Sequence, residues 1–328
     1  SAGNDHRLGA HEAPPAIISI YLGSYIEDIL FSLYQDHPSI RKDASTVDFT
    51  PLTNLAYIPH DNADRNRTSP LAFTGNKFEF RMLGSSMSAS FSNTVLNAIM
   101  AESLNGIAKQ LEGIKYLQDV REKALNICRQ MIHDHKRILF SGDGYSEEWV
   151  KEAERRGLPN VTSYIEATQV LKDPKVIHLF TSLGIYSEVE LEANRRIMEE
   201  QYDRVMDIEV KTLIEMTRKD VLPAMTAELK FYSETAAAAG SACPAFVTKR
   251  MNQLSELIDK SYAYVDRMTQ LWKDANSCGN DYECGKKIYY SVLPAMEELR
   301  ALIDRYEEIA SRSFYKLPLY EDMIFNLD

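Results

Sequence analysis

The sequence predicts an α+β protein, with a few strands in its N-terminal third and a long, mostly α-helical region after them. Three observations lead to this fold class. Apolar and charged residues alternate from Phe78 to Met82, with the period of a β-strand. Apolar residues recur at steps of three and four from Leu96 to Ile114, as in an amphipathic helix. From there to about residue 313, almost every local signal is typical of a helix.

The length and charge of the chain limit its class. Its 328 residues suffice for two domains, or for one domain with a large extension, and 45% are hydrophobic, so a sizeable core can form. The formal net charge of −11 argues against binding to nucleic acid or to an anionic membrane surface. An anionic ligand would therefore need a local basic pocket. No apolar run reaches the length of a membrane span.

The four cysteines are Cys128, Cys243, Cys278 and Cys284, and only the last two are near each other in the sequence. No C-x-x-C pair is present, so the spacing does not favour a zinc site. Scattered cysteines of this kind are typical of free thiols in a reducing compartment. We therefore expect a cytoplasmic protein.

The N-terminal elements follow from short local patterns. Residues 16–22 are an apolar run that ends at Gly23, which predicts a buried strand, and residues 24–35 have the pattern of a helix. Residues 37–70 are rich in proline and asparagine, and a loop of this length is usually functional or a lid. The second strand is predicted over residues 77–82.

The first helices after this strand have clear signals at their ends. We expect helices over residues 96–114, 120–138 and 146–157, the last ended by Gly157 and Pro159. Ser187 and Glu190 have the spacing of a capping box, which indicates the start of a long helix. On this helix one apolar stripe is predicted, formed by Met198, Tyr202, Met206, Val210 and Leu213.

Prolines and glycines divide the remaining helical region. Pro223 is expected to kink or break the long helix, because proline inside a helix costs about 3 kcal/mol. Gly240 and Pro244 indicate a turn before a helix over residues 246–274, and a last helix is expected from residue 282 to residue 313. The pentapeptide Val-Leu-Pro-Ala-Met occurs at 221–225 and at 292–296, which suggests a repeated kinked helix.

Charged residues that could carry chemistry gather before residue 82. Glu12 lies just before two prolines, and a loop carboxylate held in this way could act as a base; the alternative is an exposed loop acid. Arg65 and Arg67 lie on a polar loop and could hold phosphate or carboxylate oxygens; the alternative is a solvated basic turn.

The predicted strand over residues 77–82 carries the third group of charges. Lys77, Glu79 and Arg81 share one face of the strand by parity, and its other, apolar face is expected to pack into a core. The charged face could hold a metal and an anion. The alternative is a surface ion pair, worth about 0–1 kcal/mol. Four basic residues between positions 65 and 81 of an acidic chain favour a polyanionic substrate with a divalent cation, as in phosphoryl transfer.

In combination and in order, these segments resemble glutamine synthetase, and most closely its large type III form. The resemblance lies in residues 4–15, 65–70, 76–81, 140–159 and 317–320, so it extends along nearly the whole chain. It implies ATP-dependent joining of ammonia to glutamate. ATP would phosphorylate the γ-carboxylate, and ammonia would then displace phosphate, with Mg²⁺ or Mn²⁺ bridging the ATP phosphates.

The resemblance also implies roles for single residues. Glu12 resembles the flap glutamate that shields the intermediate and takes a proton from ammonium. Arg7 and Arg81 resemble arginines that bind the substrate glutamate. Arg67 resembles the arginine that stabilises the transferring phosphoryl group.

The remaining implied roles concern the nucleotide and the metal. Lys77 stands in place of an arginine near the nucleotide, and Arg65 is assigned to nucleotide binding with it. Glu79 resembles a ligand of the metal that bridges the ATP phosphates.

The sequence departs from the family pattern in three places. Ala72 stands where smaller types carry an arginine, which calls one phosphate contact of the family into question. The spacing from Arg7 to Glu12 is shorter by one residue than in smaller types. Met82-Leu83-Gly84 replaces their Pro-Asp after the strand arginine.

The resemblance divides the chain at residue 118. Residues 1–118 are expected to be the C-terminal part of the catalytic domain, and residues 119–328 the helical type III extension. The other metal-binding residues of the family would precede Ser1, so we expect a fragment or partly represented subunit that does not make glutamine alone. We also expect a homo-oligomer of two hexameric rings. The alternatives are a ligase that joins a different amine to glutamate, and a non-catalytic helical scaffold.

Overall fold

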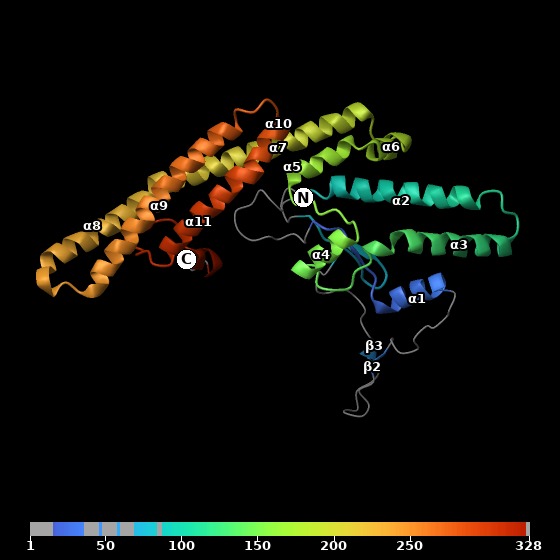
Figure 1. Ribbon diagram of the computed structural model, residues 1–328, viewed down its shortest axis with the longest axis horizontal. Coiled ribbons are helices and arrows are strands. Elements are labelled where there is room, and N and C mark those ends of the chain that lie inside the picture. The colour runs from blue at the N-terminus through green and yellow to red at the C-terminus, as the bar shows by residue number, and fades with distance from the viewer. Residues whose placement is uncertain (1–15, 36–45, 48–57, 60–68, 84–86, 326–328) are drawn as a thin grey trace. The chain divides into compact units, whose positions relative to one another are not determined.

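A computed structural model describes residues 16–35, 46–47, 58–59, 69–83 and 87–325 of the chain (Figure 1). Within these ranges helices predominate, and the strands form one three-stranded and one two-stranded sheet. The predicted combination of a small sheet with a long helical region is thereby confirmed. The chain divides into two compact units, with the boundary between Leu191 and Glu192. We call them unit 1 and unit 2.

The larger sheet lies in unit 1 and has the strand order β1-β4-β5. Strand β1 (Ile20–Tyr21) pairs in parallel with β4 (Leu71–Phe73), which pairs antiparallel with β5 (Phe78–Phe80). The second sheet pairs β2 (Thr46–Val47) with β3 (Ile58–Pro59). Both predicted strands, over 16–22 and 77–82, are therefore present but shorter than expected.

A tight turn joins β4 to β5. The backbone N–H of Thr74 donates to the carbonyl of Lys77 over 2.8 Å. Gly75 has φ +92°, a backbone conformation that residues other than glycine rarely adopt. This turn sets the register in which Glu79 lies opposite Ala72 on the middle strand. The sequence Thr-Gly-Asn-Lys therefore places Glu79 on the edge strand of the sheet.

The helices α1 (Ser24–Gln35), α2 (Ser90–Leu111) and α3 (Leu117–His135) lie side by side in unit 1 (Figure 1). The predicted helix over residues 24–35 is confirmed at both ends. The helix predicted by the apolar repeat from Leu96 is also confirmed, but its apolar face is not part of the core. Met100 is 59% exposed and Leu104 is 57% exposed. Periodicity indicates a helix, but it does not determine what covers its apolar face.

Helix α4 (Glu147–Arg155) confirms the helix predicted over 146–157. Ser146 caps it, because its hydroxyl accepts a hydrogen bond from the backbone N–H of Trp149 over 3.2 Å. Gly157 ends it at φ +67°. Trp149 is buried and stacks on Phe140, with ring centroids 3.7 Å apart. Two short helices follow, α5 (Tyr164–Ala167) and α6 (Pro174–Ser182).

The capping box predicted from Ser187 and Glu190 is present at the start of α7 (Glu188–Met216). The backbone N–H of Ser187 donates to the Glu190 carboxylate over 2.8 Å, and the N–H of Glu190 donates to the Ser187 hydroxyl over 3.3 Å. Farther along the helix, Tyr202, Met206 and Val210 are buried. The apolar stripe predicted on this helix therefore faces the core of unit 2.

The two Val-Leu-Pro-Ala-Met segments have the same local structure. A π-helical turn over Thr217–Val221 precedes α8 (Leu222–Ala239), and another over Ile288–Val292 precedes α11 (Leu293–Glu307). Each proline thereby lies in the first turn of the α-helix that follows a π turn, and the residue before it, Leu222 or Leu293, donates its N–H to the carbonyl five residues back. The interruption expected at Pro223 is confirmed and takes the form of a π turn.

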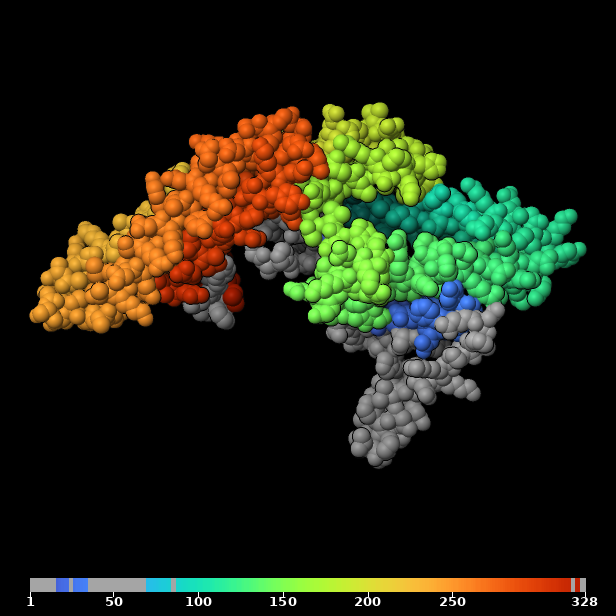
Figure 2. All heavy atoms as spheres, viewed as in Figure 1, coloured from blue at the N-terminus to red at the C-terminus, as the bar shows by residue number. Residues whose placement is uncertain are grey.

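Unit 2 is a helical bundle built around α9 (Ala245–Ala275), which packs against both α8 and α11 (Figure 1). In the space-filling view these orange and red segments form one closely packed body (Figure 2). Two short helices, α10 (Asp281–Lys287) and α12 (Tyr320–Phe325), complete the unit. The residues at the centre of its core are fully buried: Leu254, Met268, Met296 and Leu299.

The carboxylate of Glu228 is completely buried in this bundle. Glu228 on α8 has no exposed surface, and its Oε2 accepts hydrogen bonds from the Tyr306 hydroxyl over 3.2 Å and from the Ser311 backbone N–H over 3.4 Å. These bonds attach the end of α11 to α8.

In the part of the chain that the structure describes, no helix combines the length and apolar character needed to cross a membrane.

Candidate functional site

The predicted site residues fall into two groups. Arg7, Glu12, Arg65 and Arg67 lie outside the described residues, so their predicted roles stay predictions. Lys77, Glu79 and Arg81 are described, and they lie at the edge of the three-stranded sheet on and beside β5. The described part of the predicted site therefore consists of this second group.

Glu79 lies between the two basic side chains. Its Oε1 is 3.0 Å from the Lys77 Nζ, and its Oε2 accepts hydrogen bonds from the Nε and one terminal nitrogen of Arg81, over 3.2 and 2.9 Å. The Arg81 side chain is only 15% exposed, whereas that of Lys77 is 63% exposed. The three side chains therefore share one face of the strand, as parity predicts. Both carboxylate oxygens of Glu79 are engaged by cations.

These contacts set the charge of Glu79. The hydrogen bond from Lys77 lowers the pKa of its carboxyl, the hydrogen bond from Arg81 lowers it further, and slight desolvation opposes both. Glu79 is consequently ionised at neutral pH. The arrangement realises the ion pair that the sequence left open as an alternative. It also presents a charged carboxylate oxygen beside the exposed Lys77 side chain. The same geometry therefore fits both a surface ion pair and a metal ligand.

The other face of β5 is less buried than its apolar pattern predicts. Phe78 is 54% exposed and contacts Phe73 across the turn, with ring centroids 5.3 Å apart. Because β5 is a three-residue strand at the edge of a small sheet, a second layer that would cover Phe78 is absent among the described residues. The expectation that this face packs into a core is therefore wrong at Phe78.

Ala72 lies at the centre of the sheet. It is fully buried on β4, with Tyr21 of β1 beside it and Glu79 of β5 opposite it. Residues directly opposite in an antiparallel pair project to the same face. The small side chain therefore lies next to Glu79 at a buried position.

The described residues offer a metal only one carboxylate at this position. A hard cation such as Mg²⁺ takes oxygen ligands, and the ionised Glu79 carboxylate has the right chemistry for one of them. No group of three or more His, Cys, Asp or Glu side chains that could hold a metal occurs in the described parts of the chain. Glu79 thus fits as one ligand of a shared site and does not form a metal site alone.

A second candidate site, which we call the acidic pocket, lies within unit 2. It is a cavity of about 530 Å³, within the size range of small-molecule sites. Its walls come from one face of α7, the end of α9, the turn after α9, and α10. Two ion pairs lie on the α7 wall, Glu200 with Arg204 and Asp207 with Lys211.

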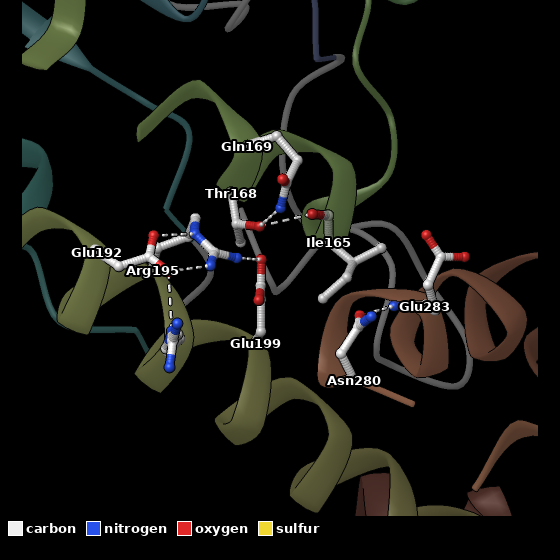
Figure 3. Close-up of polar contacts among 9 residues, drawn as sticks. Ile165, Thr168, Gln169, Glu192, Arg195, Glu199, Asn280 and Glu283 are labelled. Atoms are coloured by element: carbon white, nitrogen blue, oxygen red, sulfur yellow. Dashed lines mark hydrogen bonds and ion pairs between the residues drawn. The ribbon is translucent and has the colours of Figure 1, made fainter. Parts of the chain in front are cut away.

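Asp203 lies on the same wall, and its Oδ1 is buried without a hydrogen-bond partner. Burial, together with repulsion from Asp281 and Glu199, raises the pKa of its carboxyl to about 7. Glu199 is buried and paired with Arg195, which also binds Glu192 (Figure 3). Asp203 is therefore an acid that gains and loses its proton near neutral pH.

Asp203 was not predicted from the sequence as a site residue. Its only local signal is its place directly after Tyr202, a residue of the predicted apolar stripe on α7. Asp281, which contributes to its raised pKa, lies on α10 and is distant in the sequence. No periodic pattern relates two such positions, so only the folded unit shows that they interact.

Replacing Asp203 with asparagine is expected to remove a pH-dependent loss of stability. Between pH 3.8 and about 7 the unfolded carboxyl ionises while the folded one keeps its proton, so stability falls as pH rises through this window. One pKa unit corresponds to about 1.4 kcal/mol, and partial exposure to solvent reduces the effect. We expect Asp203→Asn to be about 1–2 kcal/mol more stable than the parent above pH 7.

Urea unfolding at about pH 4 and pH 8 measures this difference. Asp207→Asn is the matched control, because Asp207 lies on the same helix wall but is paired with Lys211 over 2.7 Å. The control should not gain stability between the two pH values relative to the parent. An Asp203→Asn variant with the parent's pH dependence would contradict the assignment.

Comparison with known proteins gives consistent matches. Residues 123–239 match the glutamine synthetase C-terminal domain family. The chain is 36% identical to the type-3 glutamine synthetase of Dictyostelium discoideum, over 98% of this chain and 45% of that protein. It is 33% identical to a glutamine synthetase of Butyrivibrio fibrisolvens, over 100% of this chain and 47% of that protein.

A third relative has the same relationship to the chain. The chain is 32% identical to a glutamine synthetase of Bacteroides fragilis (strain YCH46), over 99% of this chain and 46% of that protein. In each comparison nearly all of the chain is matched. The chain therefore spans about half the length of the curated relatives that it matches.

Proposed function

Because the chain carries the C-terminal domain of the glutamine synthetase family and resembles the type III form along its length, we propose that the protein makes glutamine from glutamate, ammonia and ATP. The observation that carries the proposal is the match of nearly the whole chain to glutamine synthetases at 32–36% identity. The proposed reaction has two steps. ATP phosphorylates the γ-carboxylate of glutamate, and ammonia then displaces phosphate from γ-glutamyl phosphate.

Four residues are proposed to act on glutamate and on the transferring group. Arg7 and Arg81 bind the substrate glutamate, since a guanidinium group holds carboxylate oxygens in a fixed geometry. Arg67 stabilises charge on the transferring phosphoryl group. Glu12 shields the intermediate and takes a proton from ammonium, which frees the nitrogen lone pair for attack.

The nucleotide side is assigned to the strand and the basic loop. Lys77 and Arg65 bind the nucleotide, and Glu79 is one ligand of Mg²⁺ or Mn²⁺. When bound, such a metal neutralises charge on the ATP phosphates. The ionised state of Glu79 and its 3.0 Å contact with the exposed Lys77 support this assignment. Lys77 can leave Glu79 Oε1 at little cost, because an exposed ion pair is worth about 0–1 kcal/mol.

Arg81 is proposed to have a second effect on Glu79. It makes two hydrogen bonds to Oε2 from a side chain that is mostly buried. A buried guanidinium group with two bonds restricts the rotation of the carboxylate. Oε2 is thereby held in place while Oε1 remains available to a metal in exchange for Lys77.

The organisation of the whole protein is part of the proposal. Residues 1–118 belong to the catalytic domain, and residues 119–328 form the helical type III extension. The protein assembles into two hexameric rings and acts in the cytoplasm. The helices of unit 2, from residue 192 onward, form a bundle with its own core, which supports a separate body for the later part of the extension. Residues 119–191 belong to unit 1 together with the sheet.

Assays of the full-length protein test the proposed reaction. Purified protein is supplied with ATP, Mg²⁺ and glutamate, and the product is identified with ammonium and with several small amines in parallel. Glutamine formed from ammonium at the highest kcat/KM supports the proposal. Preference for another amine would identify a different glutamate–amine ligase, and the absence of ATP turnover with every amine would identify a scaffold; either result overturns the proposal.

Residues 1–328 alone are expected to form no glutamine. Glu79 is the one carboxylate assigned to a metal here, and no larger metal-binding group occurs in the described ranges. The purified chain and the full-length protein are assayed at equal concentration, with circular dichroism to verify that both are helical. Glutamine formation by the chain alone, dependent on ATP and glutamate, would refute this expectation.

A further inference from the structure

Two of the cysteines lie together on the wall of the acidic pocket. Cys278 is in the turn between α9 and α10, and Cys284 is in α10. Both are free thiols of intermediate exposure and line the same cavity. Cys128 and Cys243 lie on other elements, in α3 and in the turn before α9. A small oxidant that enters the pocket therefore meets two thiols at once.

Each of the two thiols affects the environment of the other. Burial, together with the neighbouring Cys278 side chain, raises the pKa of the Cys284 thiol to about 11. Cys284 is thus held as a neutral thiol at physiological pH. The Cys278 Sγ is also 4.0 Å from the Asp274 carbonyl oxygen, at the end of α9. Both thiols therefore lie on the same part of the pocket wall.

The local backbone keeps this cluster in place on one side and leaves room on the other. The Asn280 side chain accepts a hydrogen bond from the Glu283 backbone N–H over 2.9 Å, which caps α10 next to Cys284 (Figure 3). Gly279, directly after Cys278, has open space where a Cβ would lie. The turn next to Cys278 is therefore not packed against neighbouring atoms on that side.

We propose that Cys278 and Cys284 are an oxidative modification site that forms a reversible disulfide on reaction with hydroperoxides. The Cys278 sulfur, as its thiolate, attacks the terminal oxygen of the hydroperoxide, so that an S–O bond forms and the O–O bond breaks. The leaving oxygen takes up a proton and departs as an alcohol, or as water from hydrogen peroxide. The Cys284 sulfur then attacks the Cys278 sulfenic sulfur. The S–S bond forms, the S–O bond breaks, and the Cys284 proton leaves with the hydroxyl as water.

The order of these steps follows from the environment of Cys284. Burial and the Cys278 side chain raise the pKa of the Cys284 thiol, which makes it the less reactive of the two toward peroxide; it loses its proton only as it attacks the sulfenic sulfur. Cys278 is therefore the first sulfur to react, and Cys284 resolves the sulfenic acid. The product joins the turn after α9 to α10 across the wall that faces Asp203. Formation of the disulfide needs only a peroxide as oxidant. A cellular thiol then reduces the disulfide to the two free thiols.

Mass spectrometry of the full chain tests the proposal without any variant. Cys278 and Cys284 fall on one tryptic peptide, from Asp274 to Lys286, whereas Cys128 and Cys243 fall on two others. The protein is treated with hydrogen peroxide, alkylated under denaturing conditions and digested. We expect the 274–286 peptide to lose two hydrogens in mass and to resist alkylation, and dithiothreitol to restore both alkylation sites.

Single variants identify the order of the two cysteines. Cys284→Ser should accumulate a sulfenic acid on Cys278 that dimedone traps, whereas Cys278→Ser should leave Cys284 alkylated as in the untreated protein. Cys128→Ser is the matched control and should still form the Cys278–Cys284 disulfide. If peroxide oxidises exposed Cys128 while the 274–286 peptide remains fully alkylated, or carries only separate sulfinic acids, the proposal is overturned.

Discussion

Replacing Glu79 with alanine is expected to abolish metal-dependent ATP binding by the full-length protein. Glu79 is the metal ligand assigned within the described residues, and its carboxylate is ionised by its contacts with Lys77 and Arg81. Loss of a residue that only orients a metal ligand reduces metal affinity about 10–100-fold, so loss of the ligand itself should exceed about 100-fold. Calorimetric titration with ATP at fixed Mg²⁺, and again with EDTA, measures the metal-dependent part.

Glu152 provides a matched control for this experiment. It is also a glutamate between two cations, with Arg155 at 2.7 Å and Arg156 at 2.6 Å, and these contacts lower the pKa of its carboxyl to about 2. It lies on α4 rather than at the sheet edge. Glu152→Ala removes an ion pair of the same kind and should leave ATP binding unchanged. Equal ATP affinity in Glu79→Ala and the parent would exclude the assigned role of Glu79.

Replacing Leu299 with alanine is expected to destabilise the helical bundle by about 2–5 kcal/mol. Leu299 is fully buried on α11, which packs against α9. The smaller side chain loses burial and leaves a cavity that a close-packed core does not refill. Since domains are stable by about 5–15 kcal/mol in total, this loss is a large fraction of the stability of unit 2. Urea unfolding followed by circular dichroism, with hydrogen exchange of the α11 peptides, measures it.

Leu104 is the contrasting position for the same substitution. It belongs to an equally regular apolar repeat, on α2, but it is 57% exposed. Leu104→Ala should change the free energy of unfolding by no more than about 0.5 kcal/mol, as is usual for surface substitutions. Similar losses at Leu104 and Leu299 would show that α2 is buried in solution, contrary to the structure.

Helix positions could be predicted from the sequence because their signals are local. The capping box at Ser187 and the stop at Gly157 each involve residues within one turn of a helix. The interruption before Pro223 follows from the missing N–H of one residue. That the interruption is a π turn, and that it recurs before Pro294, is a detail of hydrogen bonding that propensity does not specify.

Strands were predicted less well because each strand depends on a partner elsewhere in the chain. The apolar run over 16–22 contains only a two-residue strand, which ends where its pairing with β4 ends. Strand β5 likewise extends only as far as its pairing with Leu71, Ala72 and Phe73. The length of a strand is therefore set by its neighbour and by the turn between them.

The same distinction applies to the two candidate sites. Lys77, Glu79 and Arg81 are two residues apart in turn, so strand parity was enough to place them on one face. Asp203 and Asp281 come from α7 and α10, and the chain between them gives no sign that they share a cavity. The burial of Asp203 and its repulsion from Asp281, which raise the pKa of Asp203, arise only in the folded unit.

The sequence by itself determined most of the long helices and the charged face of β5, because each depends on residues close in the chain. The tertiary structure decided which apolar faces are covered. It buries Leu299, leaves Leu104 and Phe78 exposed, and brings Cys278, Cys284 and Asp203 to one cavity. Burial and electrostatic environment depend on all neighbours of a residue in space, and a periodic pattern contains information only about neighbours along the chain.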